Sequence, residues 1–304
     1  MNNGYVVDRV KAYFDLIRPF TLLAPIIVSS SIMIASFFYN QISGQLLNFL
    51  YTTILPASFA LAILNGASNT LNQITDVPTD RISKPYRPIP MGKVSLIEAK
   101  ITAVTLYLIA ISISIFINQM FFLFMLLIMV FTVTYSLPPR VKDILFLNQI
   151  WIGLPRGFLG ILASWSVFGN SLEPLPVMIG SIAMLFLIGG SITKDIIDCE
   201  ADKITNTKTM INIYGNKKAA LMVFPFLFFP FAYIPIFIHC GILQPYLWLL
   251  TFLAIPGFFI IYLIMRDNKK TRILENTSSW TLMYITYFVF ASSFSILTVI
   301  ESIG

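Results

Sequence analysis

The sequence contains nine apolar segments, each long enough to cross a lipid bilayer as a helix. The hydrocarbon core of a bilayer takes about 20 apolar residues in an α-helix, and this chain is 57% apolar and only 11% charged over 304 residues. Backbone amides in lipid must hydrogen-bond within the chain, so the segments are predicted to be helical. The predicted spans are 19–39, 50–72, 95–117, 120–137, 146–168, 174–193, 219–238, 245–265 and 280–300. The sequence therefore predicts an all-α, polytopic membrane protein.

The basic residues are distributed unevenly between the two sides of this bundle. None of the 20 Lys and Arg residues lies in the alternate connections around Gln41, Asn118, Asn170 and Gln244. Cytoplasmic loops of membrane proteins are enriched in Lys and Arg. We therefore expect a protein of the cytoplasmic membrane with a cytoplasmic N-terminus and an outer C-terminus.

The net charge of +6 follows from this topology and gives little reason to expect nucleic acid as a partner. Lys and Arg at the membrane surface can bind anionic lipid headgroups, so membrane lipid is the expected partner. Cys199 and Cys240 are expected on opposite sides of the membrane, where they cannot form a disulfide. The single histidine, His239, is expected on the outer side and away from any site.

Two groups of acidic and amide side chains stand where long apolar segments end. Asn72, Asp76 and Asp80 form one cluster, and Asp198 and Asp202 form the other. Residues four apart on an α-helix lie on nearly the same face, so each cluster is predicted to form one oxygen-rich stripe. Both clusters fall on the predicted cytoplasmic side.

The clusters occupy matching places in a coarse internal repeat. Helix two and helix six each end in one cluster and lead into a long polar connection. We interpret residues 1–304 as a single transmembrane domain with two four-helix halves, 12–145 and 146–275, and a ninth helix. In this arrangement the two stripes can face each other across a shared cavity.

Several carboxylates beside a low-dielectric wall need a cation between them. Mg²⁺ prefers oxygen ligands and often leaves part of its coordination shell to substrate phosphates. No His or Cys ligand accompanies the clusters in a pattern that would favour zinc. Nearby cations could bind the phosphate oxygens that the metal leaves uncovered: Arg81, Lys84, Arg87, Lys194, Lys203 and Lys208. The pattern favours a Mg²⁺-diphosphate site, although one acidic pair alone is often a helix cap or a partner of a nearby lysine.

One charge lies well inside a predicted span. Arg156 stands in a Pro155-Arg156-Gly157 break of the fifth segment. It either holds this break through a partner or binds a phosphate or an anionic acceptor, for which a permanently charged guanidinium is suited. Asp195 is a second open case, because it can be a neighbour of the metal or only a partner of Lys194.

The motifs resemble those of a known family. The run NQITDVPTDR from Asn72 and the run KPYRPIPMG from Lys84 resemble the NxxxDxxxD signature and its RPIPxG extension in the UbiA superfamily of intramembrane prenyltransferases. The run KDIIDCEAD from Lys194 resembles the second signature, DxxxD. The Arg18-Pro19 start of helix one and the Tyr135-Ser136 end of helix four are also similar to that family.

The resemblance implies transfer of a polyprenyl group from its diphosphate, with a geranylgeranyl-like donor, to a lipid or aromatic acceptor, with release of pyrophosphate. It implies two Mg²⁺ ions, with Asn72, Asp76, Asp80, Asp198 and Asp202 as ligands. Asp76, Asp198 and Lys194 are expected to be catalytic. The residues expected to bind substrate are Arg18, Arg81, Lys84, Arg87, Tyr135, Arg140, Arg156 and Lys203. The acceptor could be a prenylglyceryl phosphate or a quinone precursor, since the Lys84 run resembles archaeal ether-lipid and chlorophyll-type members.

Departures from the family pattern leave the ligands intact and the acceptor open. Gln73 and Ala201 replace residues that many relatives have as Asp and Gly. The main alternative is a secondary transporter of an anionic or phosphorylated substrate, which would also be a helical bundle with repeats. Transporters place ionisable residues near the bilayer midplane, whereas the acids here lie near the predicted surfaces. An inactive lipid-binding relative is a third possibility, against which the intact ligands argue.

Overall fold

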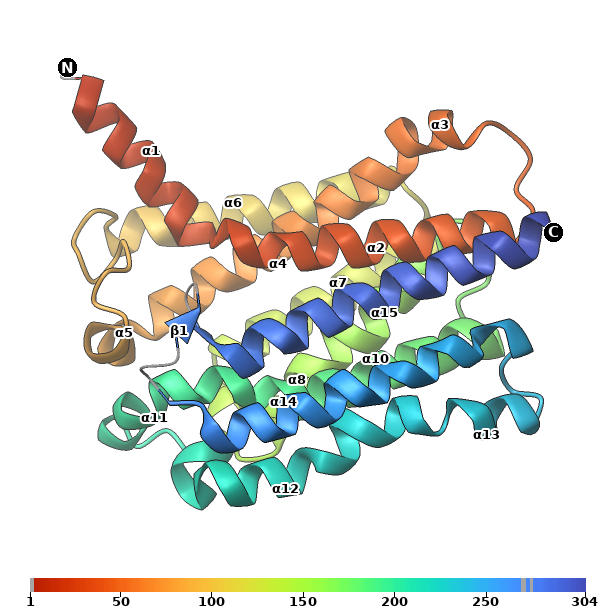
Figure 1. The fold of residues 1–304 in the computed structure, drawn as a ribbon. Helices are drawn as coiled ribbons and strands as arrows, with labels where there is room; N and C mark the ends of the chain where they lie inside the picture. Colours follow the sequence, from red (N-terminus) through yellow and green to blue (C-terminus); the bar gives the residue numbers. More distant parts are fainter. Residues whose placement is uncertain (1–2, 269–271, 274–275) are drawn as a thin grey trace.

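The computed structural model is a bundle of long helices, described for residues 3–268, 272–273 and 276–304 (Figure 1). The long helical stretches are α2 (Pro19–Tyr39), α3 (Leu46–Phe49) with η1 (Leu50–Ile54) and α4 (Leu55–Thr75), α6 (Leu96–Ile115), α7 (Gln119–Ser136), α8 (Leu147–Gly153) with η3 (Leu154–Leu159) and α9 (Gly160–Trp165), α10 (Pro174–Gly190) with η4 (Ser191–Lys194) and α11 (Asp195–Ile204), α12 (Met210–Ala232) with α13 (Ile234–His239), η5 (Pro245–Leu253) with α14 (Ala254–Arg266), and α15 (Ser278–Ile303). The short elements are α1 (Asn3–Ile17), α5 (Val77–Ser83), η2 (Val141–Asp143), β1 (Arg272–Ile273) and β2 (Asn276–Thr277). The predicted all-α class is confirmed, with one two-residue antiparallel pairing of β1 and β2 as the exception.

Seven stretches of the described chain are helices long and apolar enough to cross a membrane. The predicted spans 146–168 and 219–238 correspond to less regular stretches, because η3 is a π-helical turn and a break at Tyr233 separates α12 from α13. The count of nine spans therefore stays a prediction. Outward-facing apolar residues such as Ile255, Phe258 and Phe259 are more than half exposed, as expected for side chains in contact with lipid.

The contacts between helices follow the order of the chain and close into a ring. From α2 each stretch packs against the next, through α4, α6, α7, η3, α10, α12 and α14, and α15 then returns to α2. Such a ring encloses an interior that helices from both parts of the chain can line. The predicted halves 12–145 and 146–275 stay a prediction, and residue 275 lies outside the described residues.

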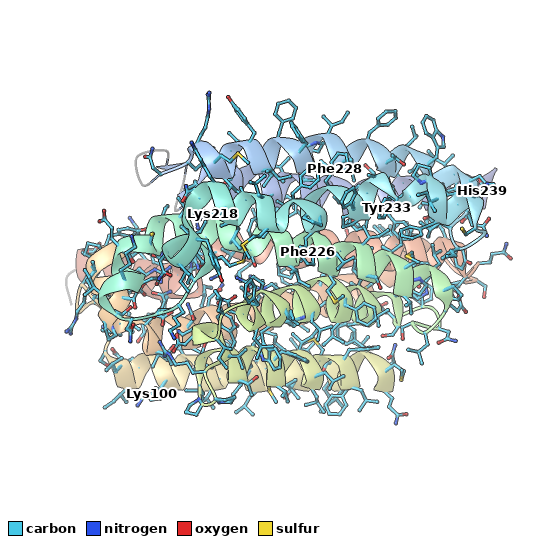
Figure 2. All side chains as sticks on the ribbon, turned by 90° about the horizontal axis from the view of Figure 1, so that it is seen from below. Lys100, Lys218, Phe226, Phe228, Tyr233 and His239 are labelled. Atoms are coloured by element: carbon cyan, nitrogen blue, oxygen red, sulfur yellow. The ribbon has the colours of Figure 1, made fainter. Side chains whose placement is uncertain are left out.

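One end of the bundle collects the polar connections. In Figure 1, α1, α5 and α11 lie at the same end, opposite α3, α13 and the C-terminus. Lys100 and Lys218 lie toward this polar end in Figure 2, whereas His239 lies at the far end. The expectation that both acidic clusters share one end of the molecule is thus confirmed. Which side of the membrane this end faces stays a prediction.

The first acidic stripe is not one continuous helix face, contrary to the sequence prediction. The chain breaks at Asp76, whose φ of −104° and ψ of 14° are not helical, and Asp80 lies on the separate helix α5. Pro78 explains the break, because a proline has no N–H to donate to the preceding turn and its ring clashes with that turn. The second cluster also follows a change of helix type, since η4 is a 3₁₀ turn between α10 and α11.

The orientation of the bundle can be tested with the two native cysteines, which lie at opposite ends. Cys240 is exposed, beside His239. In a Cys199→Ser variant, a membrane-impermeant maleimide should label Cys240 in intact cells and not in sealed inverted vesicles. A cysteine at the exposed Lys208 position, placed in a cysteine-free background, should show the reverse pattern. Labelling of Cys240 only in inverted vesicles would mean that the predicted topology is wrong.

Candidate active site

A polar cavity opens at the end of the bundle that carries α5 and α11, and both acidic clusters line it. We call it the polar cavity, and the acidic side chains of its lining are Asp76, Asp80, Asp143, Asp195, Asp198 and Asp202. The first cluster comes from the α4–α5 junction and the second from α11, which packs against α5. The predicted confrontation of the two clusters is therefore present in the structure.

Five of these carboxylates are each paired with a cation of the cavity, including Asp143, which accepts from Arg140 Nε at 2.5 Å. Asp80 accepts from the Arg87 guanidinium at 2.6 Å, and Asp195 accepts from Lys194 Nζ at 2.6 Å. Asp198 is in direct contact with Lys84 Nζ. Asp76 is in direct contact with Lys142 Nζ and also accepts from Arg140 at 3.2 Å. The cavity therefore carries charges of both signs in close pairs.

Burial shapes the electrostatics of the pairs on α5 and η2. Desolvation lowers the pKa of Lys84, and the nearby Asp198 carboxylate opposes this shift. Desolvation likewise lowers the pKa of Lys142, and the Asp76 carboxylate opposes this shift. Desolvation raises the pKa of Asp80, and the Arg87 guanidinium opposes that shift. In each of these groups the ion pair opposes the effect of desolvation on the pKa, but desolvation determines the direction of the shift.

Asp202 differs from the other carboxylates because it has no ion-pair partner among the described residues. Its side chain is buried, and among the described residues the carboxylate accepts one side-chain hydrogen bond, from Thr209 Oγ1 at 3.4 Å. A buried carboxylate without a counter-charge is costly. A divalent cation between the two clusters would supply that charge.

The donor atoms fit a hard cation. Asn72 contributes an amide oxygen beside Asp76, and the remaining candidate ligands on the lining are carboxylates. Oxygen donors without His or Cys are the ligands that Mg²⁺ prefers. Within the described residues, no three His, Cys, Asp or Glu side chains already converge as a metal-binding group. Five of the six carboxylates of the cavity are instead paired with lysine or arginine side chains.

A second, apolar cavity continues from the first into the interior of the bundle. It is lined by residues such as Val28, Leu61, Leu64, Ile128 and Leu187, from α2, α4, α7 and α10. Eight residues line both cavities: Thr21, Thr132, Ile152, Pro155, Arg156, Lys194, Trp280 and Tyr284. The site as a whole therefore has a charged head region and an apolar continuation.

Most of the residues predicted for the site line the polar cavity. These are Arg18, Asn72, Asp76, Asp80, Lys84, Arg87, Tyr135, Arg140, Arg156, Lys194, Asp198 and Asp202. Arg81 and Lys203 do not line it and are exposed. Both lie on helix faces that turn away from the cavity, although their sequence neighbours Asp80 and Asp202 turn toward it.

Sequence reasoning missed Lys142 as a site residue. Its ammonium donates to Asn72 Oδ1 at 3.2 Å and to Thr75 Oγ1 at 3.1 Å, in addition to its contact with Asp76. Its position two residues after Arg140 was the available signal, but spacing in a loop does not reveal which side chain turns inward. Asp195, left open by the sequence, is buried in the cavity wall.

The sequence matches known proteins over most of its length. The family model described as the UbiA prenyltransferase family matches residues 22–283. A digeranylgeranylglyceryl phosphate synthase from Saccharolobus solfataricus is 27% identical over 266 residues, which cover 85% of this chain and 88% of that protein. The enzyme of the same name from Methanocaldococcus jannaschii is 28% identical and covers 88% of this chain and 90% of its own.

Solved structures share the fold. A UbiA homologue from Archaeoglobus fulgidus bound to GPP and Mg²⁺ has a TM-score of 0.69 at 21% identity, covering 95% of this chain and 99% of that one. An apo UbiA homologue from Aeropyrum pernix has a TM-score of 0.68 at 18% identity, covering 89% and 96% of the two chains. The helical architecture around the cavity is therefore common to these proteins.

The Asp80–Arg87 pair provides a test of how strongly the site depends on its internal charges. Both side chains are buried, so Arg87→Ala should leave an uncompensated carboxylate and lower the free energy of unfolding by about 3 kcal/mol. Thermal unfolding in detergent would measure this loss. The exposed neighbour Arg81 offers a matched control, and Arg81→Ala should change stability little. Equal stability of the two variants would contradict the assigned role of the pair.

Proposed function

This chain belongs to the UbiA prenyltransferase family, and we propose that it transfers a polyprenyl group from its diphosphate to an acceptor in a Mg²⁺-dependent reaction. The bond between the allylic carbon and the diphosphate oxygen breaks, and its electron pair leaves with pyrophosphate. A new bond forms between that carbon and the acceptor, which loses a proton. The products are the prenylated acceptor, pyrophosphate and a proton.

The observation that carries this proposal is the union of the two cavities. A polyprenyl diphosphate has a highly charged head and a long apolar tail. The polar cavity offers carboxylates and cations, and the apolar cavity begins at the same residues, Arg156 and Lys194 among them. A geranylgeranyl-like donor would place its diphosphate between the acidic clusters and its tail among the apolar side chains.

The proposed metal ligands are Asn72, Asp76, Asp80, Asp198 and Asp202, which we expect to hold two Mg²⁺ ions. Bound Mg²⁺ would neutralise the diphosphate and make it a better leaving group. The oxygen-only donor set supports this assignment, and so does the Asp202 carboxylate, which has no ion-pair partner among the described residues. Divalent metal use is also supported by homologous structures that contain Mg²⁺ or Cd²⁺.

The cations of the polar cavity would bind the phosphate oxygens that the metal leaves free. Lys84, Arg87, Arg140 and Lys194 already face carboxylates, and phosphate can take the place of a carboxylate as a hydrogen-bond acceptor. Arg18 lines the same wall, and its φ of 57° marks the sharp junction between α1 and α2. Arg81 and Lys203 are left out of the proposed site because they do not line the cavity.

For the acceptor we propose a prenylglyceryl phosphate or a quinone precursor. The curated relatives named above are archaeal digeranylgeranylglyceryl phosphate synthases, which supports the first of these. Tyr135 lines the polar cavity at the end of α7 and is a candidate contact for the acceptor or the diphosphate. The transporter alternative has no comparable support, since the matched family is one of transferases.

The metal assignment predicts that loss of either acidic cluster stops transfer. Asp76→Asn and Asp198→Asn should each lower turnover by about 10²-fold or more, because an electrostatic stabiliser of the leaving group is lost. Turnover is measured as release of pyrophosphate from geranylgeranyl diphosphate in the presence of Mg²⁺ and a prenylglyceryl phosphate. Glu173→Gln, at the start of α10 and at the opposite end of the bundle, is the control and should keep full activity. Full activity of the wild type in excess chelator would rule the assignment out.

The same proposal predicts that the diphosphate enters and leaves on one side. The candidate ligands all lie at the end of the bundle that carries α5 and α11, so substrate added on that face should release pyrophosphate to the same face. Sealed vesicles of known orientation and labelled donor provide the measurement, with and without an ion gradient. Gradient-driven accumulation of intact substrate inside the vesicles would favour the transporter.

A further inference from the structure

Arg156 occupies a fixed place in the wall between the two cavities. It lies on the π-helical turn η3, and its backbone oxygen accepts a hydrogen bond from the Tyr287 hydroxyl of α15 at 3.0 Å. The neighbouring Gly157 packs so closely on α10 that an added Cβ would lie 2.6 Å from Met184 Cα. The turn is therefore held on its α10 face, while the Arg156 side chain lines both cavities.

The Arg156 guanidinium has no hydrogen-bond or ion-pair partner among the described residues, although the cavity contains several carboxylates. Lys84, Arg87, Arg140, Lys142 and Lys194 of the same cavity each contact a carboxylate. The side chain remains exposed even though η3 packs against α7 and α10. Its accessible surface faces the cavities.

The absence of a protein partner argues against a purely structural role. The Arg156 guanidinium is exposed to the cavities, so it is accessible to an anion there, and a charge beside an apolar wall is stabilised by such a partner. Its planar fork can bind a phosphate or carboxylate through two parallel hydrogen bonds. An anion that enters with a substrate would stabilise this charge in the bound state.

Arg156 lies away from the place proposed for the diphosphate, so the anion that it would bind is a different group. Asp76, Asp80, Asp198 and Asp202 line only the polar cavity, so a diphosphate held by metal between them would lie on that side. Arg156 lines the apolar cavity as well, at the place where the first carbons of the prenyl chain would begin. Lys194 shares this position, but Asp195 already neutralises it at 2.6 Å.

Two aromatic side chains line the same part of the cavity wall as Arg156. Trp280 and Tyr284 of α15 line both cavities, and their ring centroids lie 4.4 Å apart. Flat apolar faces beside a guanidinium suit an amphiphilic molecule with an anionic group. A molecule bound there would hold its nucleophile next to the allylic carbon.

We propose that Arg156 binds the anionic group of the acceptor, so that the enzyme selects acceptors carrying a phosphate or a carboxylate over neutral ones. This inference rests on the proposed prenyl transfer and narrows its second substrate. The two anions have different sources, a prenylglyceryl phosphate or a hydroxybenzoate, and both are included in the test together with neutral analogues.

The experiment measures steady-state transfer from geranylgeranyl diphosphate with saturating Mg²⁺. The acceptors are a prenylglyceryl phosphate, a hydroxybenzoate, and the neutral glycerol ether and phenol that lack the anionic group. Arg156→Gln should raise the KM of the anionic acceptor by about 10-fold to 100-fold, as expected for losing a charge-assisted hydrogen-bond pair. The KM of the donor should change less than about threefold, because Arg156 would not contact the diphosphate and a change of this size corresponds to less than one lost hydrogen bond.

Two further variants separate binding from folding. Arg156→Lys keeps the charge without the fork and should give an intermediate KM for the acceptor. Arg266→Gln removes an arginine that lies over the Tyr262 ring outside both cavities, and should leave both KM values unchanged. Thermal unfolding of each variant shows whether the protein remains folded.

The outcomes distinguish this inference from the proposed function. If the wild type consumes no donor with any acceptor, the proposed transfer itself fails. If it transfers prenyl groups but uses neutral acceptors as well as anionic ones, the inference is overturned, even where no Arg156 variant folds. An equal rise in the KM of donor and acceptor in Arg156→Gln would assign the residue to the diphosphate instead.

Discussion

The pairing of charges inside an apolar bundle is the constraint on which the rest of this structure depends. Lys84 and Asp198 join α5 to α11, so the two acidic clusters are drawn together by an ion pair as well as by helix packing. Lys142 and Arg140 similarly connect the loop after α7 to Asp76. In a low-dielectric interior an unpaired member of any of these pairs would cost several kcal/mol. The polar cavity is stable as a whole because its charges compensate one another.

The same pairs make the cavity receptive to a charged ligand. In the proposed reaction, a divalent cation would attract the carboxylates and a diphosphate would attract the lysines and arginines, so a metal-bound diphosphate would replace both sets of partners together. Each internal ion pair would then be exchanged for two contacts with the ligand, and its charges would stay compensated. Asp202 and Arg156 stand apart, since among the described residues neither has an oppositely charged partner. These two residues mark where the protein alone leaves the charge distribution incomplete.

Irregular helix geometry is concentrated around the site. The break at Asp76, the 3₁₀ turn η4 and the π-helical turn η3 all contribute residues to the polar cavity. A regular helix would direct residues four apart along one slowly rotating face. The interruptions change that direction, and Asp80 and Asp198 reach the cavity from short helices that follow such a change. Local departures from helix regularity at functional sites are common in proteins.

The helical class, the two acidic clusters and their shared end of the bundle were predicted from the sequence. Apolar length, the period of the α-helix and the spacing of Asn72, Asp76 and Asp80 are local properties, and local properties can be read from the chain. Which side chains turn inward could not be predicted, because it depends on packing between helices that are far apart in sequence. For this reason Lys142 was missed, and Arg81 and Lys203, which were predicted to bind substrate, do not line the cavity. The same holds for the Lys194 partner of Asp195 and for Arg156, which has no charged partner in the described part of the chain, since an ion pair forms only where packing brings two side chains within reach.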